Sequence, residues 1–262
     1  MPRPTYKILE VTAENPEDMY CSRSKRKEEG YQNKIKWIKQ RFKEGLRYWS
    51  LLVDEGRKDY SYRGMIEAMP GDKCWRGIDA PNYMVIHCLW VIGKNKGKGY
   101  GTKLVNKVIE SAKKNNMDGV AVMTVREKKG GWTPKSNIFE KNDFSMCDSI
   151  LDTFDIHALK FNENAPDPKF VPLIELEGEY KKGTHVFVSY QCPYMAGTIK
   201  SLQKLAEDEF NEEVSIHEMS TYEDARKYGF HPYGTFHITR NGRYITHLPG
   251  GFRDIQKEFE KL

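Results

Sequence analysis

The chain has 262 residues, of which 39% are hydrophobic and 30% are charged. At roughly 150 residues per domain this length predicts two domains, and the composition is that of a globular protein. No apolar run reaches the ~18 residues that a membrane helix needs. The first residues lack the apolar stretch of a secretory signal. We therefore expect a cytoplasmic protein with no membrane partner.

The five cysteines are scattered and form no C-x-x-C pair, so the sequence supports neither a disulfide framework nor a metal site. They are Cys21, Cys74, Cys88, Cys147 and Cys192. The net charge of +5 is uneven: residues 1–182 carry +7 and residues 183–262 carry −2. A positive excess attracts a phosphorylated cofactor or a nucleic acid, but no recognised nucleic-acid motif accompanies it. We expect no nucleic-acid partner.

Hydrophobic periodicity predicts a mixed α/β layout over the first 160 residues. The predicted strands are 6–12, 48–53, 60–68, 83–92, 119–124 and two within 144–161. Helices are predicted within 17–43, along the apolar stripe 104–112 that ends at Asn115-Asn116, and at 134–142. The strand 83–92 (YMVIHCLWVI) is apolar nearly throughout, which is typical of a strand buried on both faces.

The most informative segment is the glycine-rich loop that links this buried strand to an amphipathic helix. It contains alternating glycines at Gly97, Gly99 and Gly101, together with Lys96 and Lys98. Glycine lets the backbone turn tightly and approach a ligand, and the first N–H groups of a helix favour an anion. The pattern is neither a dinucleotide-binding fingerprint nor a Walker loop. It predicts a pyrophosphate site.

The segment from Lys96 to Gly101 (KGKGYG) resembles the acetyl-CoA signature of the GNAT superfamily of N-acetyltransferases, with Lys96 in place of the usual Arg or Gln. Residues 137–144 (NIFEKNDF) are similar to a second GNAT segment, Tyr-Glu-Lys-Leu-Gly-Phe. The resemblance covers about residues 1–162 and implies the acyl-CoA N-acyltransferase fold. It also implies a set of cofactor-binding residues: Leu89, Trp90 and Val91 for the pantetheine arm, and Lys96, Gly97, Lys98, Gly99, Tyr100, Gly101 and Thr102 for the pyrophosphate.

Acetyl transfer to an amine requires a base, because only the neutral amine attacks. In many GNAT enzymes the base lies two residues before the Leu-x-Val that reads Leu89-Trp90-Val91 here, and this position is His87. The ordinary pKa of histidine, ~6.5, suits a general base. The alternative is a strand histidine that a neighbouring backbone group satisfies.

The general acid of the family is the Tyr of its second segment, and this position is Phe139 here, which donates no proton. Tyr100, Cys147 or water then protonates the departing thiolate, or no acid is needed. The identity of the acid stays open.

The segment 162–172 holds three prolines and predicts a boundary between domains. We expect the acetyltransferase domain at 1–162, a linker at 163–182 and a second domain at 183–262. The second domain has predicted strands at 184–190 and 214–219, helices at 195–210 and 221–228, a hairpin over 235–246 and a last helix.

Cys192-Pro193-Tyr194-Met195 follows a strand and begins a helix, a place where a thiol pKa is lowered. The pattern resembles thioredoxin-like domains, and the whole arrangement resembles acetyltransferases with a YoaP-like C-terminal domain. Met195 replaces the second cysteine, and Gly234 stands where the thioredoxin cis-proline is expected, two residues after Pro232. Both departures argue against redox catalysis.

The sequence thus predicts an enzyme that transfers the acetyl group of acetyl-CoA directly to a primary amine of a small molecule or peptide. Two alternatives remain: a CoA-binding regulatory protein without turnover, favoured by Phe139, and a thiol-dependent redox protein that uses Cys192. The sequence indicates neither the acceptor nor the oligomeric state.

Overall fold

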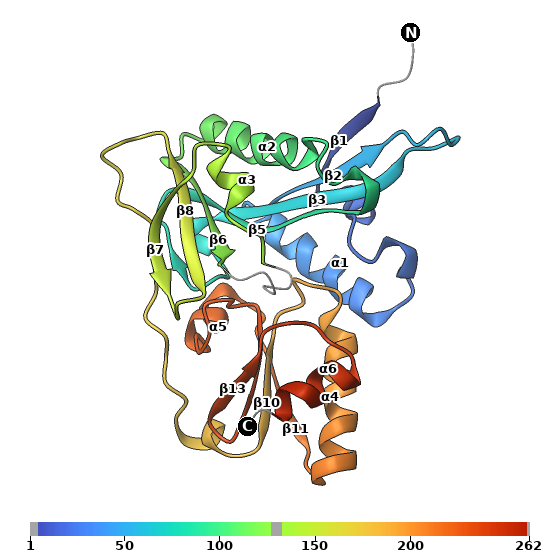
Figure 1. Cartoon of the computed structure of the whole chain (residues 1–262), viewed down its shortest axis with the longest axis vertical. Coiled ribbons are helices and arrows are strands. Elements are labelled where there is room, and N and C mark those ends of the chain that lie inside the picture. The colour runs from blue at the N-terminus through green and yellow to red at the C-terminus, as the bar shows by residue number, and fades with distance from the viewer. Residues whose placement is uncertain (1–4, 127–132, 261–262) are drawn as a thin grey trace. The chain divides into compact units, whose positions relative to one another are not determined.

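The computed structural model describes residues 5–126 and 133–260 (Figure 1). The described chain forms two compact units. Of the described residues, unit 1 contains 5–23, 38–74, 78–126 and 133–170, and unit 2 contains 24–37, 75–77 and 171–260. Each unit has its own mixed β-sheet.

Unit 1 is built on a seven-stranded sheet with the order β1-β2-β3-β5-β6-β8-β7. Only β5 and β6 are parallel, and every other neighbouring pair is antiparallel. The strands are β1 (Tyr6–Val11), β2 (Arg47–Val53), β3 (Ser61–Pro70), β5 (Tyr83–Val91), β6 (Gly119–Val125), β7 (Ser145–Ile150) and β8 (Phe154–Lys160). The predicted mixed sheet is confirmed, with strand ends within two residues of those expected.

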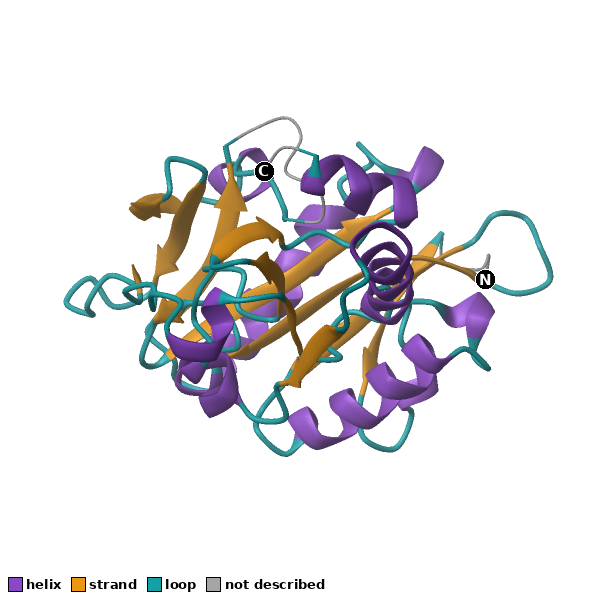
Figure 2. Ribbon diagram, turned by 90° about the horizontal axis from the view of Figure 1, so that it is seen from below, coloured by secondary structure: helices purple, strands orange, loops and turns teal. Residues whose placement is uncertain are grey.

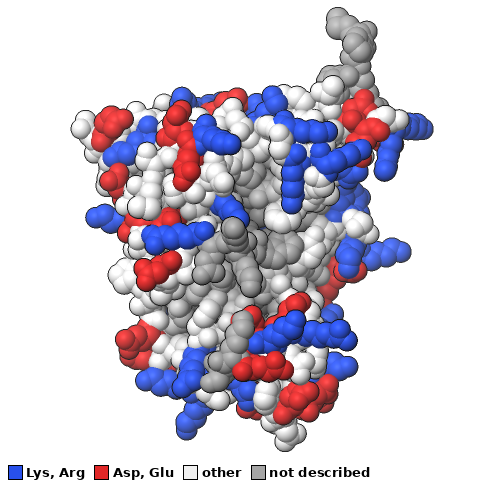
Figure 3. Space-filling view, viewed as in Figure 1, with Lys and Arg blue, Asp and Glu red and all other residues white. Residues whose placement is uncertain are grey.

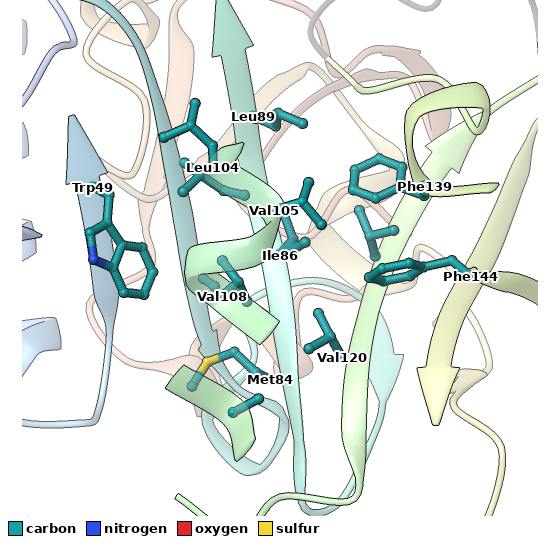
Figure 4. Packing of buried hydrophobic residues seen from close by; sticks show 14 of the residues in the cluster. Trp49, Met84, Ile86, Leu89, Leu104, Val105, Val108, Val120, Phe139 and Phe144 are labelled. Carbon is teal, nitrogen blue, oxygen red and sulfur yellow. The ribbon is translucent and has the colours of Figure 1, made fainter. Parts of the chain in front are cut away.

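Helix α2 (Tyr100–Lys114) covers one face of this sheet and supplies much of its core. Its apolar stripe, Leu104, Val105, Val108 and Ala112, is fully buried. Figure 4 shows this stripe against Met84, Ile86 and Leu89 of β5, with Phe139 and Phe144 beside it. Burying such side chains contributes about 1.5–3 kcal/mol each, so the contact fixes where α2 begins. The short helix α3 (Asn137–Glu140) carries Phe139 into the same core.

Unit 2 has a four-stranded sheet with the order β11-β10-β12-β13. Strands β10 (Thr184–Val188) and β11 (Val214–Glu218) are parallel, whereas β12 (Phe236–Arg240) and β13 (Arg243–Thr246) form an antiparallel hairpin. The helices are α4 (Met195–Phe210), α5 (Tyr222–Lys227) and α6 (Phe252–Phe259), drawn in purple in Figure 2. The hairpin turns at Asn241 and Gly242, both with positive φ, as the sequence predicts.

Two details of the fold go beyond the predicted elements. A two-stranded ladder pairs β4 (Ile78–Asp79) with β9 (Lys169–Phe170). Helix α1 (Glu29–Phe42) begins well after the first charged residues of the predicted helical region and crosses from unit 2 to unit 1 at residues 37 and 38. The division into an acetyltransferase domain at 1–162, a linker at 163–182 and a second domain at 183–262 stays a prediction.

Candidate active site

The glycine-rich loop leads into the N-terminus of α2 without any side-chain cap. Gly97 has a φ of 75° and Gly99, the N-cap residue, also has a φ of 75°. The first helical hydrogen bond runs from the N–H of Lys103 to the carbonyl of Gly99 at 3.1 Å. The N–H groups of Tyr100, Gly101 and Thr102 therefore precede the hydrogen-bond ladder of the helix. Such a set of N–H groups binds anions.

The space next to these glycines is open. A Cβ atom added to Gly93, Gly97 or Gly99 would meet no atom within 4 Å. Lys96 and Lys98 are exposed in the same loop, and the face that Figure 3 shows carries both basic and acidic side chains. The loop therefore combines room, N–H donors and positive charge, which is what a diphosphate requires. These residues fit the pyrophosphate of coenzyme A.

Two contacts fix the start of α2 against α3. Asn142 donates from Nδ2 to Thr102 Oγ1 at 3.4 Å and to the carbonyl of Ile138 at 2.6 Å. A Cβ atom on Gly101 would lie 2.4 Å from Ile138 Cδ1. Residues 137–144, which the GNAT resemblance singles out, thus pack directly against the predicted phosphate loop.

The central strands β5 and β6 separate halfway along their length. Their parallel pairing joins residues 83–86 to residues 119–122 and stops there, although β5 continues to Val91 and β6 to Val125. On that side, the main-chain groups of Leu89 and Val91 are not paired with β6. Main-chain groups at such a gap can bond an extended ligand arm. Lys96 Nζ lies 5.5 Å from the centre of the Trp90 ring, so the two predicted groups of cofactor-binding residues meet.

A β-bulge at His87 accompanies this separation. Glu67 of β3 pairs with Cys88, and the next residue, Ala68, pairs with Ile86, so His87 is the extra residue of β5. Bulges bend a strand and redirect side chains, and they are frequent next to active sites. The bulge places His87 where β5 leaves β6.

The side chain of His87 is fully buried and lies between a thiol and a carboxylate. Its Nε2 is 3.5 Å from Cys74 Sγ, and its Nδ1 is 3.8 Å from Glu67 Oε1. All three residues are at most 3% exposed. Both ring nitrogens face groups that can exchange or share a proton.

Cys74 and Glu67 were not among the candidate residues of the sequence analysis. Glu67 had a recognisable signal, because it is a single acidic residue within the apolar run of β3 (GMIEAMP). Cys74 had none, since it lies in an irregular segment after a short 3-10 helix (Gly71–Lys73), and only the fold brings it to His87.

The candidates for a general acid are distributed over the sheet. Phe139 is fully buried, and its ring packs edge-on against that of Phe144 with 5.5 Å between the ring centres, so it is part of the hydrophobic core. Tyr100 is half-buried beside Tyr6 at the start of α2. Cys147 lies on the edge strand β7, where its Sγ contacts two carbonyl oxygens and burial raises its pKa to about 11. A thiol with so high a pKa is a weak acid, which argues against Cys147.

Cys192 belongs to unit 2 and lies just before α4. It is half-buried, and its carbonyl accepts from the N–H of Met195 at 3.3 Å. Gly234, with a φ of 72°, packs against Trp75, because a Cβ there would lie 2.0 Å from the Trp75 carbonyl oxygen. All five cysteines lie within the described residues, and they form no disulfide with one another.

Comparison with known proteins gives the class of the molecule. The model of the acetyltransferase (GNAT) family matches residues 9–129. A relative from Bacillus subtilis (strain 168), described as the uncharacterized N-acetyltransferase YoaP, is 33% identical over 259 residues, which is 97% of each chain. The chain belongs to the GNAT acetyltransferase family. It is an acetyl-CoA-dependent acyltransferase, with acetyl-CoA as its cosubstrate.

Solved structures of this family also resemble the chain. One is the PaiA N-acetyltransferase from Thermoplasma acidophilum in complex with coenzyme A, with 14% identity and a TM-score of 0.41, covering 60% of this chain and 100% of that one. Another is a GNAT-family acetyltransferase from Staphylococcus aureus Mu50, with 16% identity and a TM-score of 0.40, covering 60% and 99%. Similarity at this level does not imply a shared substrate.

Two observations concern metals and membranes. Among residues 5–126 and 133–260, no group of three or more His, Cys, Asp or Glu side chains is arranged to hold a metal ion. No helix within those ranges is both long and apolar enough to cross a bilayer.

Proposed function

We propose that this chain transfers the acetyl group of acetyl-CoA to a primary amine of a small molecule or a peptide in the cytoplasm. The observation that carries the proposal is the start of α2, where the N–H groups of residues 100–102 follow two glycines with φ of 75°, and a Cβ on either glycine would meet no atom within 4 Å. The separation of β5 from β6 supplies main-chain groups for the pantetheine arm.

His87 is the proposed base of this reaction. Its position at the bulge of β5 supports the role, and so does the carboxylate of Glu67 next to Nδ1, which stabilises the protonated ring. In the direct route, His87 takes the proton of the attacking amine.

Titration calorimetry with acetyl-CoA tests the proposal at its first step. We expect heat of binding, a rise in Tm and competition by free CoA. Turnover is then measured as release of free CoA with a panel of alkyl amines, a polyamine and peptides with free amines. Absence of both heat and thermal shift at saturating acetyl-CoA would refute the assignment.

A regulatory CoA-binding protein without turnover is the second candidate, because Phe139 removes the family's acid and is buried in the core. It predicts binding of acetyl-CoA with no CoA release for any amine. A thiolate is a tolerable leaving group, so the missing acid does not exclude catalysis.

We also propose that unit 2 is a thioredoxin-like, YoaP-like domain. Its sheet order, with one parallel pair and a C-terminal hairpin, supports this, as does the position of Cys192 directly before α4. Met195 in place of a second cysteine excludes an intramolecular dithiol at this motif. A redox role would therefore require Cys192 alone, and we expect Cys192→Ser to leave acetyl transfer unchanged.

A further inference from the structure

A cavity of about 300 Å³ lies in unit 2 beside the end of α5. Three aromatic side chains line it: Tyr180 from the short 3-10 helix Gly178–Lys181, and Tyr228 and Phe230 from the segment that follows α5. All three are half-buried, so each keeps part of its surface accessible. A cavity of this size is at the lower end of those that bind small molecules.

The three rings stand at steep angles to one another. The ring centre of Tyr180 lies 6.2 Å from that of Tyr228, with 83° between the ring planes, and 5.7 Å from that of Phe230, with 55°. The centres of Tyr228 and Phe230 are 6.5 Å apart, with 49° between the planes. The face of an aromatic ring attracts a cation within about 6 Å of its centre. A cation in the cavity can therefore contact more than one ring.

The ring of Tyr180 has a firm, uncharged support. It packs edge-on against Phe187 with 5.6 Å between the centres, and against His217 with 5.3 Å. Burial lowers the pKa of His217, so its ring is neutral at pH 7. No positive charge of this histidine therefore opposes a cation in front of Tyr180.

Two carboxylates, those of Glu175 and Glu177, line the same cavity. The N–H of Ile174 donates to the carbonyl of Gly229 at 3.1 Å, which ties the segment that carries them to the segment after α5. Both glutamates are exposed, and within the part of the chain that the structure describes neither carboxylate forms an ion pair or hydrogen bond. Their charges favour a positively charged occupant.

The chain itself already places one cation on this site. Nζ of Lys227, the last residue of α5, lies 5.0 Å from the centre of the Tyr228 ring, and Lys227 also lines the cavity. The contact shows that the ring is accessible to an ammonium group. Because Lys227 is exposed and its stem is flexible, an incoming cation can displace it.

We propose that the cavity lined by Tyr180, Tyr228 and Phe230 binds an alkylammonium group. Glu175 and Glu177 supply the opposite charge. This inference goes beyond the proposed acetyl transfer, because it assigns a ligand to unit 2 and does not depend on acetyl-CoA. Since an amide carries no positive charge, the cavity distinguishes an amine from its N-acetyl derivative.

An NMR titration of the full chain tests the proposal. The probes are n-butylammonium chloride and N-butylacetamide, which share an alkyl chain and differ in charge, at constant ionic strength. We expect butylammonium to shift the amide resonances of residues 174–180 and 227–230, and N-butylacetamide to bind there at least tenfold more weakly. Nα-acetyl-lysine methylamide is the third probe, because its side-chain ammonium is its only charge. Tighter binding than butylammonium would identify the ligand as a lysine of a peptide, and weaker binding would identify a free amine, both within the proposed class.

Variants locate the site. Tyr228→Leu removes one ring and should raise the Kd for butylammonium at least about fivefold, whereas Tyr228→Phe keeps the ring and should leave Kd unchanged. Lys227→Gln removes the competing ammonium and should lower Kd. The double variant Glu175→Gln with Glu177→Gln should raise Kd about threefold at low ionic strength and less at high ionic strength. Glu209→Gln, an exposed carboxylate of α4 outside the cavity, is the matched control.

Equal binding of butylammonium and N-butylacetamide would overturn the proposal, because an apolar cavity would take both. A higher Kd in Lys227→Gln would also overturn it, since the lysine would then assist the ligand rather than compete with it. These substitutions at Lys227, Glu175 and Glu177 change exposed side chains, so they test the site even if Tyr228→Leu fails to fold. Failure to bind acetyl-CoA would reject the proposed function and leave this result unaffected.

Discussion

Glu55 and Arg63 form a two-point ion pair that reaches the phosphate loop. Arg63 donates from Nε to Glu55 Oε1 at 2.9 Å and from Nη2 to Oε2 at 2.5 Å. The same Oε1 accepts from Nδ2 of the buried Asn95 at 3.3 Å and lies 3.7 Å from Lys94 Nζ. The hydrogen bond from Arg63 is the main cause that lowers the pKa of Glu55 to about 2. The turn between β2 and β3 thus anchors the segment that enters the predicted phosphate site.

Replacing this anchor should weaken cofactor binding. In Glu55→Gln the neutral amide loses the charge-assisted contacts with Arg63 and Lys94. The phosphate loop is then less ordered in the free protein and loses more conformational entropy when a ligand binds. We expect Kd for acetyl-CoA to rise about fivefold, the equivalent of one hydrogen bond of about 1 kcal/mol. Glu110→Gln, an exposed carboxylate of α2 that pairs with Lys107, is the control and should leave Kd unchanged. Equal Kd values for both variants would show that the anchor does not act on the loop.

A matched pair of variants distinguishes the effect of Gly99, at the start of α2, on ligand affinity from its effect on stability. Gly99 and Gly183 both have a φ of 75°, and a Cβ on either would meet nothing within 4 Å. Alanine costs each about 1–2 kcal/mol of backbone strain. In Gly99→Ala we expect this loss together with weaker acetyl-CoA binding, because the methyl group enters the space next to the N–H groups. In Gly183→Ala only stability should fall. Calorimetry measures the affinity of the two variants for acetyl-CoA, and thermal unfolding measures their stability. An unchanged affinity in Gly99→Ala would show that the diphosphate does not bind next to Gly99.

The sequence predicted the elements well because each one has a local signal. The stripe of α2 and the glycines before it define a helix start, and the structure begins α2 at Tyr100. The separation of β5 and β6 carries no such signal, since it is a property of pairing between strands distant in sequence. The contact between Cys74 and His87 also has no local signal, because hydrophobic periodicity does not predict which buried residues of different segments meet. Local patterns thus locate the predicted cofactor loop, whereas the groups around His87 depend on register.

The proposed base gives a prediction on rate and on pH dependence. His87→Ala should lower kcat/KM at least tenfold, because a general base contributes roughly 10²–10⁴-fold to the rate, with little loss of acetyl-CoA affinity. Cys74 and Glu67 are titratable groups that face His87 in the described part of the chain. Removal of the imidazole should therefore abolish the limb of the pH–rate profile that reports its protonation.

The control for this variant is Cys88→Ala, which changes the neighbouring residue of the same strand and keeps the imidazole. It should retain the profile. A His87→Ala enzyme with the same profile as the unmodified chain would remove His87 from the mechanism.

Unit 2 should lose stability in acid because it buries neutral histidines. Burial lowers the pKa of His237 to about 3 and that of His247 to about 3, below the ordinary ~6.5. Between these values the unfolded chain binds protons that the folded chain excludes. The free energy of unfolding therefore falls as the pH drops from ~6.5 towards 3, by about 1.4 kcal/mol per pH unit for each such group.

His237→Phe isolates one of these groups. The ring of His237 stacks on Phe187 at 4.7 Å, and neither of its nitrogens has a hydrogen-bond partner within the described part of the chain. Phenylalanine keeps the stacked ring and removes the unsatisfied polar atoms, so the variant should be more stable by about 1 kcal/mol at pH 7. This advantage should widen as the pH falls below 6.5, because the variant has no proton to exclude. Urea unfolding at a series of pH values measures the gap. Phe230→Leu, in the same aromatic cluster, should instead shift stability by a constant amount, and a constant gap for His237→Phe would mean that His237 is protonated in the folded protein.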